Sequence, residues 1–133
     1  MGQPVPPFWP GRRVLVTGAA SPLGRDLIDE LLGRRAAVVA LLGRSDGLGE
    51  LTKRVAVARG RADDPTRLTT TMVLHDIATI FHLAATGLTA VQAAARLAGG
   101  VPVVVPPVAS LDAVADLIWR AEALAAPAAR AAA

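Results

Sequence analysis

Apolar positions in this chain fall into five short, nearly continuous runs, and longer stretches with mixed polarity separate them. Runs of this kind are typical of parallel strands that are covered on both faces of a sheet. The predicted strands are Arg12–Thr17, Ala37–Leu42, Arg54–Ala58, Thr79–Ala84 and Val101–Pro106.

The stretches between these runs carry apolar residues at helical spacing. In the first, leucines and an isoleucine share one side of the helix while acidic residues lie on the other. The third ends at Gly99 and Gly100 in the manner of a C-cap, and Ser45–Lys53 is weakly helical at best. The predicted helices are Pro22–Arg34, Pro65–Leu74, Thr89–Ala98 and Ser110–Ala126.

Strands that alternate with helices predict βαβ units and a parallel sheet with right-handed crossovers. The expected fold class is α/β: a single doubly wound Rossmann-like domain of about five parallel strands, in the order 3-2-1-4-5, with helices on both faces. This domain is expected over residues 11–126, after an irregular Pro-rich segment 1–10 and before an Ala-rich tail 127–133. A flavodoxin-like strand order is the main alternative, and the first β–α turn argues against it.

That first turn is a loop of small residues, Thr17–Gly24, between a strand and a helix. Gly18 permits a tight turn and Gly24 permits close helix packing, while the helix N-terminus offers N–H groups to a pyrophosphate. Ser21 as N-cap and Pro22 at the first helical position make a coherent helix start. In a phosphate-binding turn with the spacing G-x-x-G-x-x-G, Ser21 would occupy the position of the middle glycine, and Pro22 lacks an N–H. We therefore expect weaker phosphate binding than a full set of glycines gives. The alternative interpretation is an ordinary capped helix.

The segment Thr17–Gly24 resembles the nucleotide loop of short-chain dehydrogenases/reductases, especially of their extended, NAD-dependent epimerase/dehydratase branch. Ile80–Ala85 resembles the fourth-strand motif of the same family, whose small residues line the nicotinamide side of the cleft. Asp64–Leu68 and Ala93–Gly99 are similar to the segments that follow the third and fourth strands. The resemblance covers about Arg12 to Ala125.

This resemblance implies a dinucleotide partner, NAD or NADP. The positions that it implicates in cofactor binding are Gly18, Ser21, Pro22, Leu23, Gly24, Arg44, Ala84 and Ala85.

Two departures from the family concern the cofactor. The acid that binds the ribose would fall at Leu42 or Gly43, and Arg44 follows directly. An arginine without a competing carboxylate accommodates a 2′-phosphate, so NADP is favoured over NAD; the alternative is a solvated arginine. The aspartate expected on the adenine side falls at Arg61, with Asp63 and Asp64 nearby, and Asp64 before Pro65 is better explained as a helix cap.

A third departure concerns catalysis. The chain has no tyrosine, and its one lysine is Lys53, whereas the family uses a tyrosine and a lysine four residues apart beside a serine. Alignment places Val114 and Ile118 at the first two positions, where they resemble ordinary core residues, and Ser110 lies close to the third. An apolar pair cannot transfer a proton. The family's C-terminal substrate-binding region is also missing, so we expect the cofactor half of such an enzyme without independent oxidoreductase activity.

Two alternatives stay open. The first is a pseudoenzyme subunit or interaction domain that binds no cofactor and forms a homo- or hetero-oligomer with an active homologue, with Trp119 at the contact. The alternative interpretation of Trp119 is that its side chain covers the sheet. The second alternative is an active reductase whose proton donor is His82 or a bound water; a packed strand histidine is the simpler interpretation of His82.

Composition and charge exclude other classes. The net charge is +3, and nearly all the basic residues are arginines. No aromatic residue lies within the mildly basic stretch from Arg34 to Arg67, so no nucleic-acid partner is expected. No apolar run reaches the roughly 18–20 residues of a membrane helix, and the N-terminus lacks a signal-peptide pattern, so we expect a cytoplasmic protein without a membrane partner. The absence of cysteine excludes disulfides and thiolate catalysis, and His75 and His82 have no clustered ligands to support a metal site.

Overall fold

The structure is a computed structural model that describes residues 7–107 and 110–132, with the side chains of the last helix described as far as residue 125. Five parallel strands form one sheet in the order β3-β2-β1-β4-β5, which confirms the predicted fold class and excludes the flavodoxin-like order. The strands are β1 Arg13–Thr17, β2 Ala37–Leu42, β3 Ala56–Arg59, β4 Thr79–His82 and β5 Val103–Val104.

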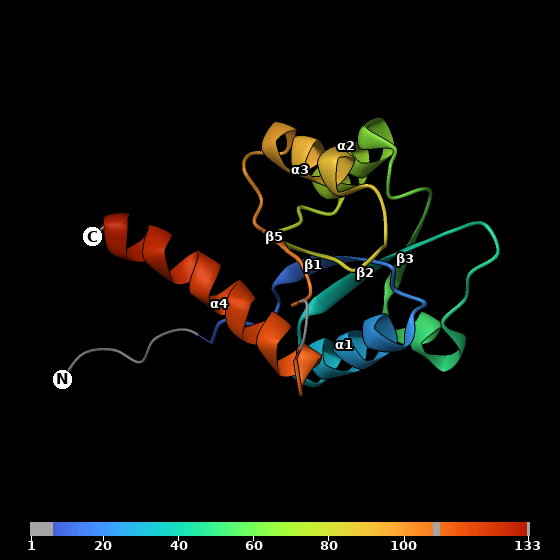
Figure 1. Ribbon diagram of the computed structural model, residues 1–133, viewed down its shortest axis with the longest axis horizontal. Coiled ribbons are helices and arrows are strands. Elements are labelled where there is room, and N and C mark those ends of the chain that lie inside the picture. Colours follow the sequence, from blue (N-terminus) through green and yellow to red (C-terminus); the bar gives the residue numbers. More distant parts are fainter. Residues whose placement is uncertain (1–6, 108–109, 133) are drawn as a thin grey trace.

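Helices cover both faces of the sheet. Helices α2 and α3 pack together on one face, and α1 and α4 pack together on the other (Figure 1). Among the described residues, no helix is both long enough and apolar enough to cross a membrane. The helices are α1 Pro22–Gly33, the short 3₁₀ helix η1 Gly49–Arg54, α2 Pro65–Leu74, α3 Leu88–Leu97 and α4 Ala113–Ala132.

The two elements nearest the C-terminus differ from the prediction. Strand β5 comprises only two residues of the predicted Val101–Pro106, because Pro102 and Pro106 have no N–H to donate to a ladder. Helix α4 begins after Asp112, whose side chain accepts from the Ala115 N–H at 3.0 Å, and it runs on to Ala132 instead of ending at Ala126. Alanine has the highest helix propensity, which favours this continuation.

The central strand β1 divides the core into two clusters. Its side chains alternate between the faces of the sheet, so that Val14 and Val16 contact α1 and α4 while Leu15 contacts α2 and α3. All three are fully buried. Because helices cover both faces of the sheet, the side chains on both sides of each strand must be apolar, and this explains the continuous apolar runs in the sequence.

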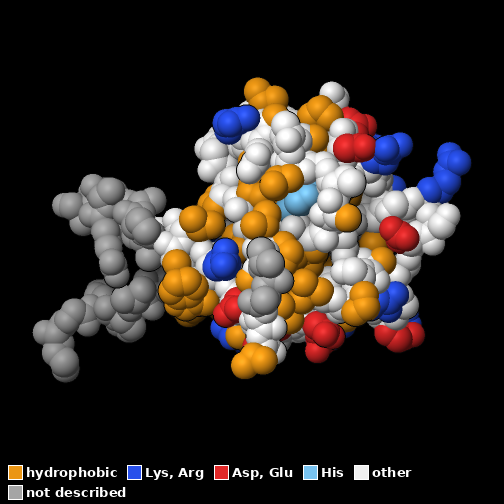
Figure 2. All heavy atoms as spheres, viewed as in Figure 1, with side chains coloured by type: hydrophobic (Ala, Val, Ile, Leu, Met, Phe, Trp, Pro, Cys, Tyr) orange, Lys and Arg blue, Asp and Glu red, His pale blue; other side chains and the backbone are white. Residues whose placement is uncertain are grey.

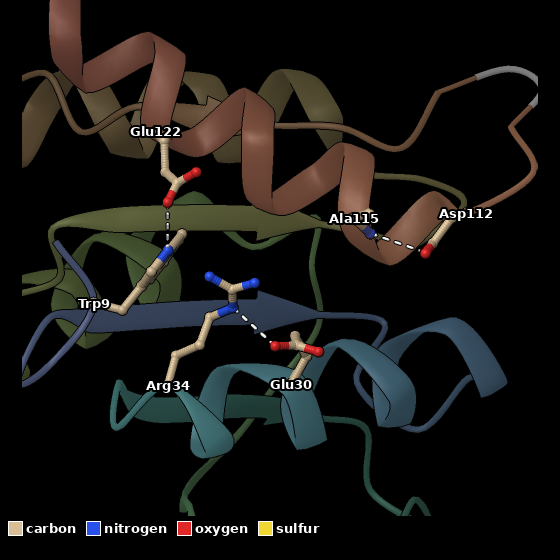
Figure 3. A network of polar contacts seen from close by, with 6 residues as sticks. All are labelled: Trp9, Glu30, Arg34, Asp112, Ala115 and Glu122. Atoms are coloured by element: carbon tan, nitrogen blue, oxygen red, sulfur yellow. Dashed lines mark hydrogen bonds and ion pairs between the residues drawn. The ribbon is translucent and has the colours of Figure 1, made fainter.

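Trp9 extends the core beyond the predicted elements. It lies in the irregular segment before β1, yet it is only 3% exposed and its ring stacks on Phe81 of β4 with centroids 6.2 Å apart. Its indole Nε1 donates to the Glu122 carboxylate of α4 at 3.1 Å (Figure 3). Trp9 therefore joins the N-terminal segment to the sheet and to the last helix. Residues 1–6 of the predicted irregular segment lie outside the described residues.

We expect the substitution Trp9→Ala to lower the free energy of unfolding by about 3–5 kcal/mol, because it leaves a large cavity between β4 and α4. Trp119→Ala is the matched control: Trp119 is 67% exposed, so its loss should cost roughly 0.5 kcal/mol or less. Urea denaturation of the two variants and the parent measures the difference. Equal destabilisation by both variants would contradict the anchoring role of Trp9.

Candidate functional site

The polar loops gather at the carboxyl edge of the sheet. The strand order reverses between β1 and β4, and open α/β sheets bind ligands in the crevice at such a switch point. A cavity of about 280 Å³ lies here, lined by Gly18 and Ala84 after β1 and β4, by Gly43 and Asp46 after β2, and by Gly60–Asp63 after β3. Of the residues predicted to bind a cofactor, the structure therefore brings Gly18 and Ala84 together at this cavity.

Two glycines are required by close approach of the backbone. Gly18 has φ +65°, and a Cβ there would lie 2.7 Å from the Ala84 amide nitrogen. A Cβ on Gly24 would lie 2.7 Å from the Ala19 carbonyl oxygen. Real Cβ atoms do not approach so closely, so the turn holds the start of α1 directly against the ends of β1 and β4.

The start of α1 is capped by its own chain. The Ser21 hydroxyl donates to the Gly18 carbonyl at 2.7 Å and accepts from the Gly24 N–H at 3.0 Å. This confirms the predicted N-cap, with Pro22 in the first turn. Within the described part of the chain, the amides of Ala20 and Leu23 make no hydrogen bond. These two amides, and the positive end of the helix dipole, are therefore among the groups that remain for an anion.

The loop after β2 brings a carboxylate back to the end of that strand. Asp46 Oδ2 accepts from the Gly43 N–H at 3.1 Å. Arg59 fixes this fold-back, because its Nη1 donates to the carbonyls of Gly43 and Asp46 at 2.7 and 2.6 Å. The acid that the sequence lacks at Leu42 and Gly43 is thus supplied near the end of β2 by a residue three positions beyond Gly43.

Arg44 lies in the same loop and is exposed. It makes no hydrogen bond or ion pair with another described residue, whereas Arg25 and Arg59 both donate to backbone carbonyls of this loop. The Arg44 guanidinium is thus the loop's uncommitted positive charge, close to the Asp46 carboxylate in sequence.

The turn after β3 carries an exposed ion pair at the cavity. Arg61 Nε and Nη2 donate to the two carboxylate oxygens of Asp63 at 2.9 and 2.8 Å. These hydrogen bonds lower the pKa of Asp63 and raise the pKa of Arg61. Asp64 accepts from the Arg67 N–H at 3.1 Å, which confirms that it caps α2.

A buried pair lies beneath the turn. The Thr17 hydroxyl oxygen accepts from the amides of Leu83 and Ala84 at 3.1 and 3.3 Å, and it lies 2.7 Å from His82 Nδ1. With both lone pairs occupied, the hydroxyl proton goes to Nδ1, and the neutral ring carries its own proton on Nε2. His82 Nε2 is buried without a hydrogen-bond partner. His82 is thus a packed strand histidine, as predicted.

The charge state of His82 follows from this environment. Burial lowers the pKa of His82, and the nearby backbone of Thr86 opposes that effect. The residue is 4% exposed. A neutral, buried imidazole is a poor proton donor to a substrate in the cavity.

The remaining predicted residues lie away from the cavity. Val114 and Ile118 pack into the core against α1 and the sheet, whereas Ala85 is exposed between the lining residues Ala84 and Thr86 without lining the cavity itself. Ser110 contacts the Asp116 carboxylate at the start of α4. The sequence analysis did not identify Asp46 or Thr86 as cavity residues, because neither belongs to a motif. For Asp46, its position a few residues beyond the end of a predicted strand was the one feature that could have indicated it.

Comparison with known proteins finds similar folds among solved structures but no matching family. No protein-family model and no curated protein sequence matches the chain. Among solved structures, UDP-glucose 4-epimerase from Brucella ovis in complex with NAD is 23% identical, with a TM-score of 0.64 over 71% of this chain and 35% of that chain. A putative epimerase from Burkholderia cenocepacia J2315 is 18% identical, with a TM-score of 0.65 over 74% of this chain and 38% of that chain.

The enzyme WbmG from Bordetella bronchiseptica in complex with NAD is 20% identical, with a TM-score of 0.64 over 76% of this chain and 39% of that chain. The chain thus spans little more than a third of the length of these proteins. The comparisons confirm the resemblance to extended short-chain dehydrogenases at the level of the Rossmann-like fold.

The environment of His82 makes stability depend on pH. Its pKa is lower in the folded chain than in the unfolded chain, so the unfolded state takes up the proton first as the pH falls. The free energy of unfolding should therefore decrease as the pH drops below about 6.5. His82→Gln should lose this component and His75→Gln should keep it, as measured by urea denaturation between about pH 8 and about pH 5. An unchanged pH dependence in His82→Gln would contradict the assignment.

Proposed function

We propose that this chain binds a nicotinamide dinucleotide, NADP(H) or NAD(H), at the carboxyl edge between β1 and β4, and that it has no hydride-transfer activity of its own. One observation carries the proposal: a cavity at the switch point of a Rossmann-like sheet lies beside a glycine turn and a helix start with unpaired amides. Structural neighbours solved with NAD support the same ligand class.

The pyrophosphate would lie against the first turn of α1. The amides of Ala20 and Leu23 are its donors, and the helix dipole adds a favourable field. The cap by Ser21 uses the Gly24 amide, and Pro22 supplies none, so fewer donors face the anion than in a full glycine fingerprint. We therefore expect modest affinity, or binding strengthened by a partner.

The choice between the two cofactors depends on opposite charges in one loop. Arg44 favours the 2′-phosphate of NADP. Asp46 opposes it, because its carboxylate lies at the end of β2, where it would accept hydrogen bonds from the ribose hydroxyls of a bound dinucleotide and would repel a phosphate. We propose that the site favours NADP(H) through Arg44 and that Asp46 reduces the margin.

The proposed lack of activity follows from the side chains at the positions where the related enzymes would carry their catalytic groups, and from the state of His82. Val114 and Ile118 pack in the core and cannot exchange protons. The hydroxyl of Ser110 is engaged with Asp116, and His82 is neutral and buried. None of these described residues can polarise and protonate a carbonyl substrate.

The first test is a titration of the purified chain with NADPH and with NADH. We expect millimolar nucleotide to raise the melting temperature, because a ligand that binds only the folded state stabilises it. Mixed with a panel of carbonyls and sugar nucleotides, the chain should not consume NADPH. No change in melting temperature with either nucleotide would overturn cofactor binding, and turnover of any substrate without a partner would overturn the lack of activity.

Charge substitutions test the cofactor choice. Arg44→Ala should lower the ratio of NADPH to NADH affinity by about fivefold, the effect of roughly 1 kcal/mol at an exposed charged contact. Asp46→Asn should raise this ratio, since asparagine retains an acceptor for the Gly43 amide and removes the charge. Arg54→Ala on η1 is the control with the same change in net charge. An unchanged ratio in Arg44→Ala would show that Arg44 does not face the 2′-phosphate.

A second candidate is a subunit or interaction domain that binds no cofactor and pairs with an active homologue. Trp119 is 67% exposed instead of covering the sheet, and with Val105 and Leu124 it lines an apolar groove between β5 and α4. Figure 2 shows hydrophobic side chains gathered at the surface along α4. Failure of both nucleotides to bind, together with association that Trp119→Ala abolishes, would favour this candidate.

A further inference from the structure

We propose that the chain has a second ligand site at the amino edge of the sheet, opposite the switch-point cavity, and that this site takes a small organic anion. The anion is a carboxylate or a phosphate monoester attached to an apolar body. The site is a cavity of about 430 Å³, here called the amino-edge cavity, between the first residues of β1, β2 and β3 and the end of α2. Its volume lies within the range of ligand pockets, roughly 300–1,000 Å³. The two cavities share none of their described lining residues, so this proposal is independent of nucleotide binding.

The floor of the amino-edge cavity is apolar and hollow because small side chains form it. Val39 belongs to the core cluster beneath α2 and α3, and Ala37, two residues earlier on β2, points to the same face. The strand register places Ala56 of β3 beside Val39, and Arg13 of β1 beside Ala37. Alanines at these positions leave space for a flat apolar group to lie against the sheet, out of water.

Two guanidinium groups lie at the rim of this floor. Arg13 and Arg54 line the cavity, and both side chains are about half exposed. Arg13 Nη1 donates to Asp76 Oδ2 at 3.1 Å, a bond that uses one of the five N–H donors of the guanidinium. Arg54 Nη1 lies 3.8 Å from Asp29 Oδ1, too far for a hydrogen bond. The lining therefore carries two arginines against one carboxylate, that of Asp76, and this balance favours an anion.

The end of α2 opposes an anion less than an open helix C-terminus would. Three of its last four carbonyls, those of residues 71–73, accept hydrogen bonds from the N–H groups of residues 75–77. Asp76 allows this closure by adopting φ +51°, the left-handed conformation of a helix C-cap. The His75 ring also lines the cavity and adds a hydrogen-bonding group to the rim.

These groups match a ligand with two unlike ends. An apolar ring or chain would lie on the alanine floor and against Leu74, which is exposed at the end of α2. Its anionic oxygens would then reach the guanidinium groups of Arg13 and Arg54, whose planar donors bind carboxylate and phosphate oxygens in pairs. A neutral ligand would gain only the floor, and a bare anion only the rim.

The experiment is an NMR titration of the ¹⁵N-labelled whole chain with benzoate, phenyl phosphate, benzyl alcohol and acetate. We expect benzoate and phenyl phosphate to shift the amides of residues 37–39, 56 and 74–76 in a saturable way. Benzyl alcohol and acetate should bind at least about fivefold more weakly, because each lacks one of the two contacts. The tighter of the two aromatic anions identifies the preferred headgroup. Equal binding of benzyl alcohol and benzoate, or no saturable shift at these residues with either aromatic anion, would overturn the proposal.

Substitutions test the rim and the floor separately. Arg13→Ala should weaken benzoate about fivefold, the effect of one exposed charged contact. Ala56→Leu fills the hollow and should abolish saturable binding, while an unchanged melting temperature shows that the fold is intact. Arg120→Ala is the control with the same change in net charge as Arg13→Ala, since Arg120 lines the groove between β5 and α4. Full benzoate affinity in both Arg13→Ala and Arg54→Ala would show that the guanidinium groups bind no ligand, and the proposal would fail.

Discussion

The ends of β1 and β4 approach so closely at Gly18 that no side chain fits between them, and the rest of the site depends on this contact. The Thr17 hydroxyl joins the two strands by accepting from the amides of Leu83 and Ala84, and its proton goes to His82. Gly24 then packs the start of α1 against the same turn. The switch-point cavity lies beside this junction, so its position is set by backbone packing and hydrogen bonds within the core.

Arginine has two kinds of role around this cavity. Arg25 and Arg59 donate to backbone carbonyls and thereby fix the loop after β2, whereas Arg61 is held flat by Asp63. Arg44 makes no hydrogen bond or ion pair with another described residue. The Asp46 carboxylate lies at the end of β2 in the same loop, where it would repel another anion. A surface that looks simply basic in the sequence is thus divided into guanidiniums that make hydrogen bonds within the fold and one, Arg44, that makes none with the described residues.

The helix start shows a conflict between stability and binding. Ser21 satisfies one of the orphan amides of α1, which stabilises the helix by about 0.5–2 kcal/mol. The same hydrogen bond removes a donor from an incoming anion, and Pro22 removes another. The cap therefore stabilises the helix at the expense of free amides at its N-terminus.

The sequence alone predicted the covering of both sheet faces, the caps at Ser21 and Asp64 and the two glycines of the first turn, because these depend on neighbours within a few residues or on hydrophobic period. The strand order followed from the alternation of strands and helices together with the type of the first turn. Only the tertiary structure decided the burial of Trp9 against α4, the pairing of Thr17 with His82 and the return of Asp46 to the end of β2. The first two join residues far apart in the chain, and the third depends on Arg59 of a neighbouring strand holding a loop in place. Local sequence patterns carry no information about such contacts, since each is fixed by which elements the sheet brings together.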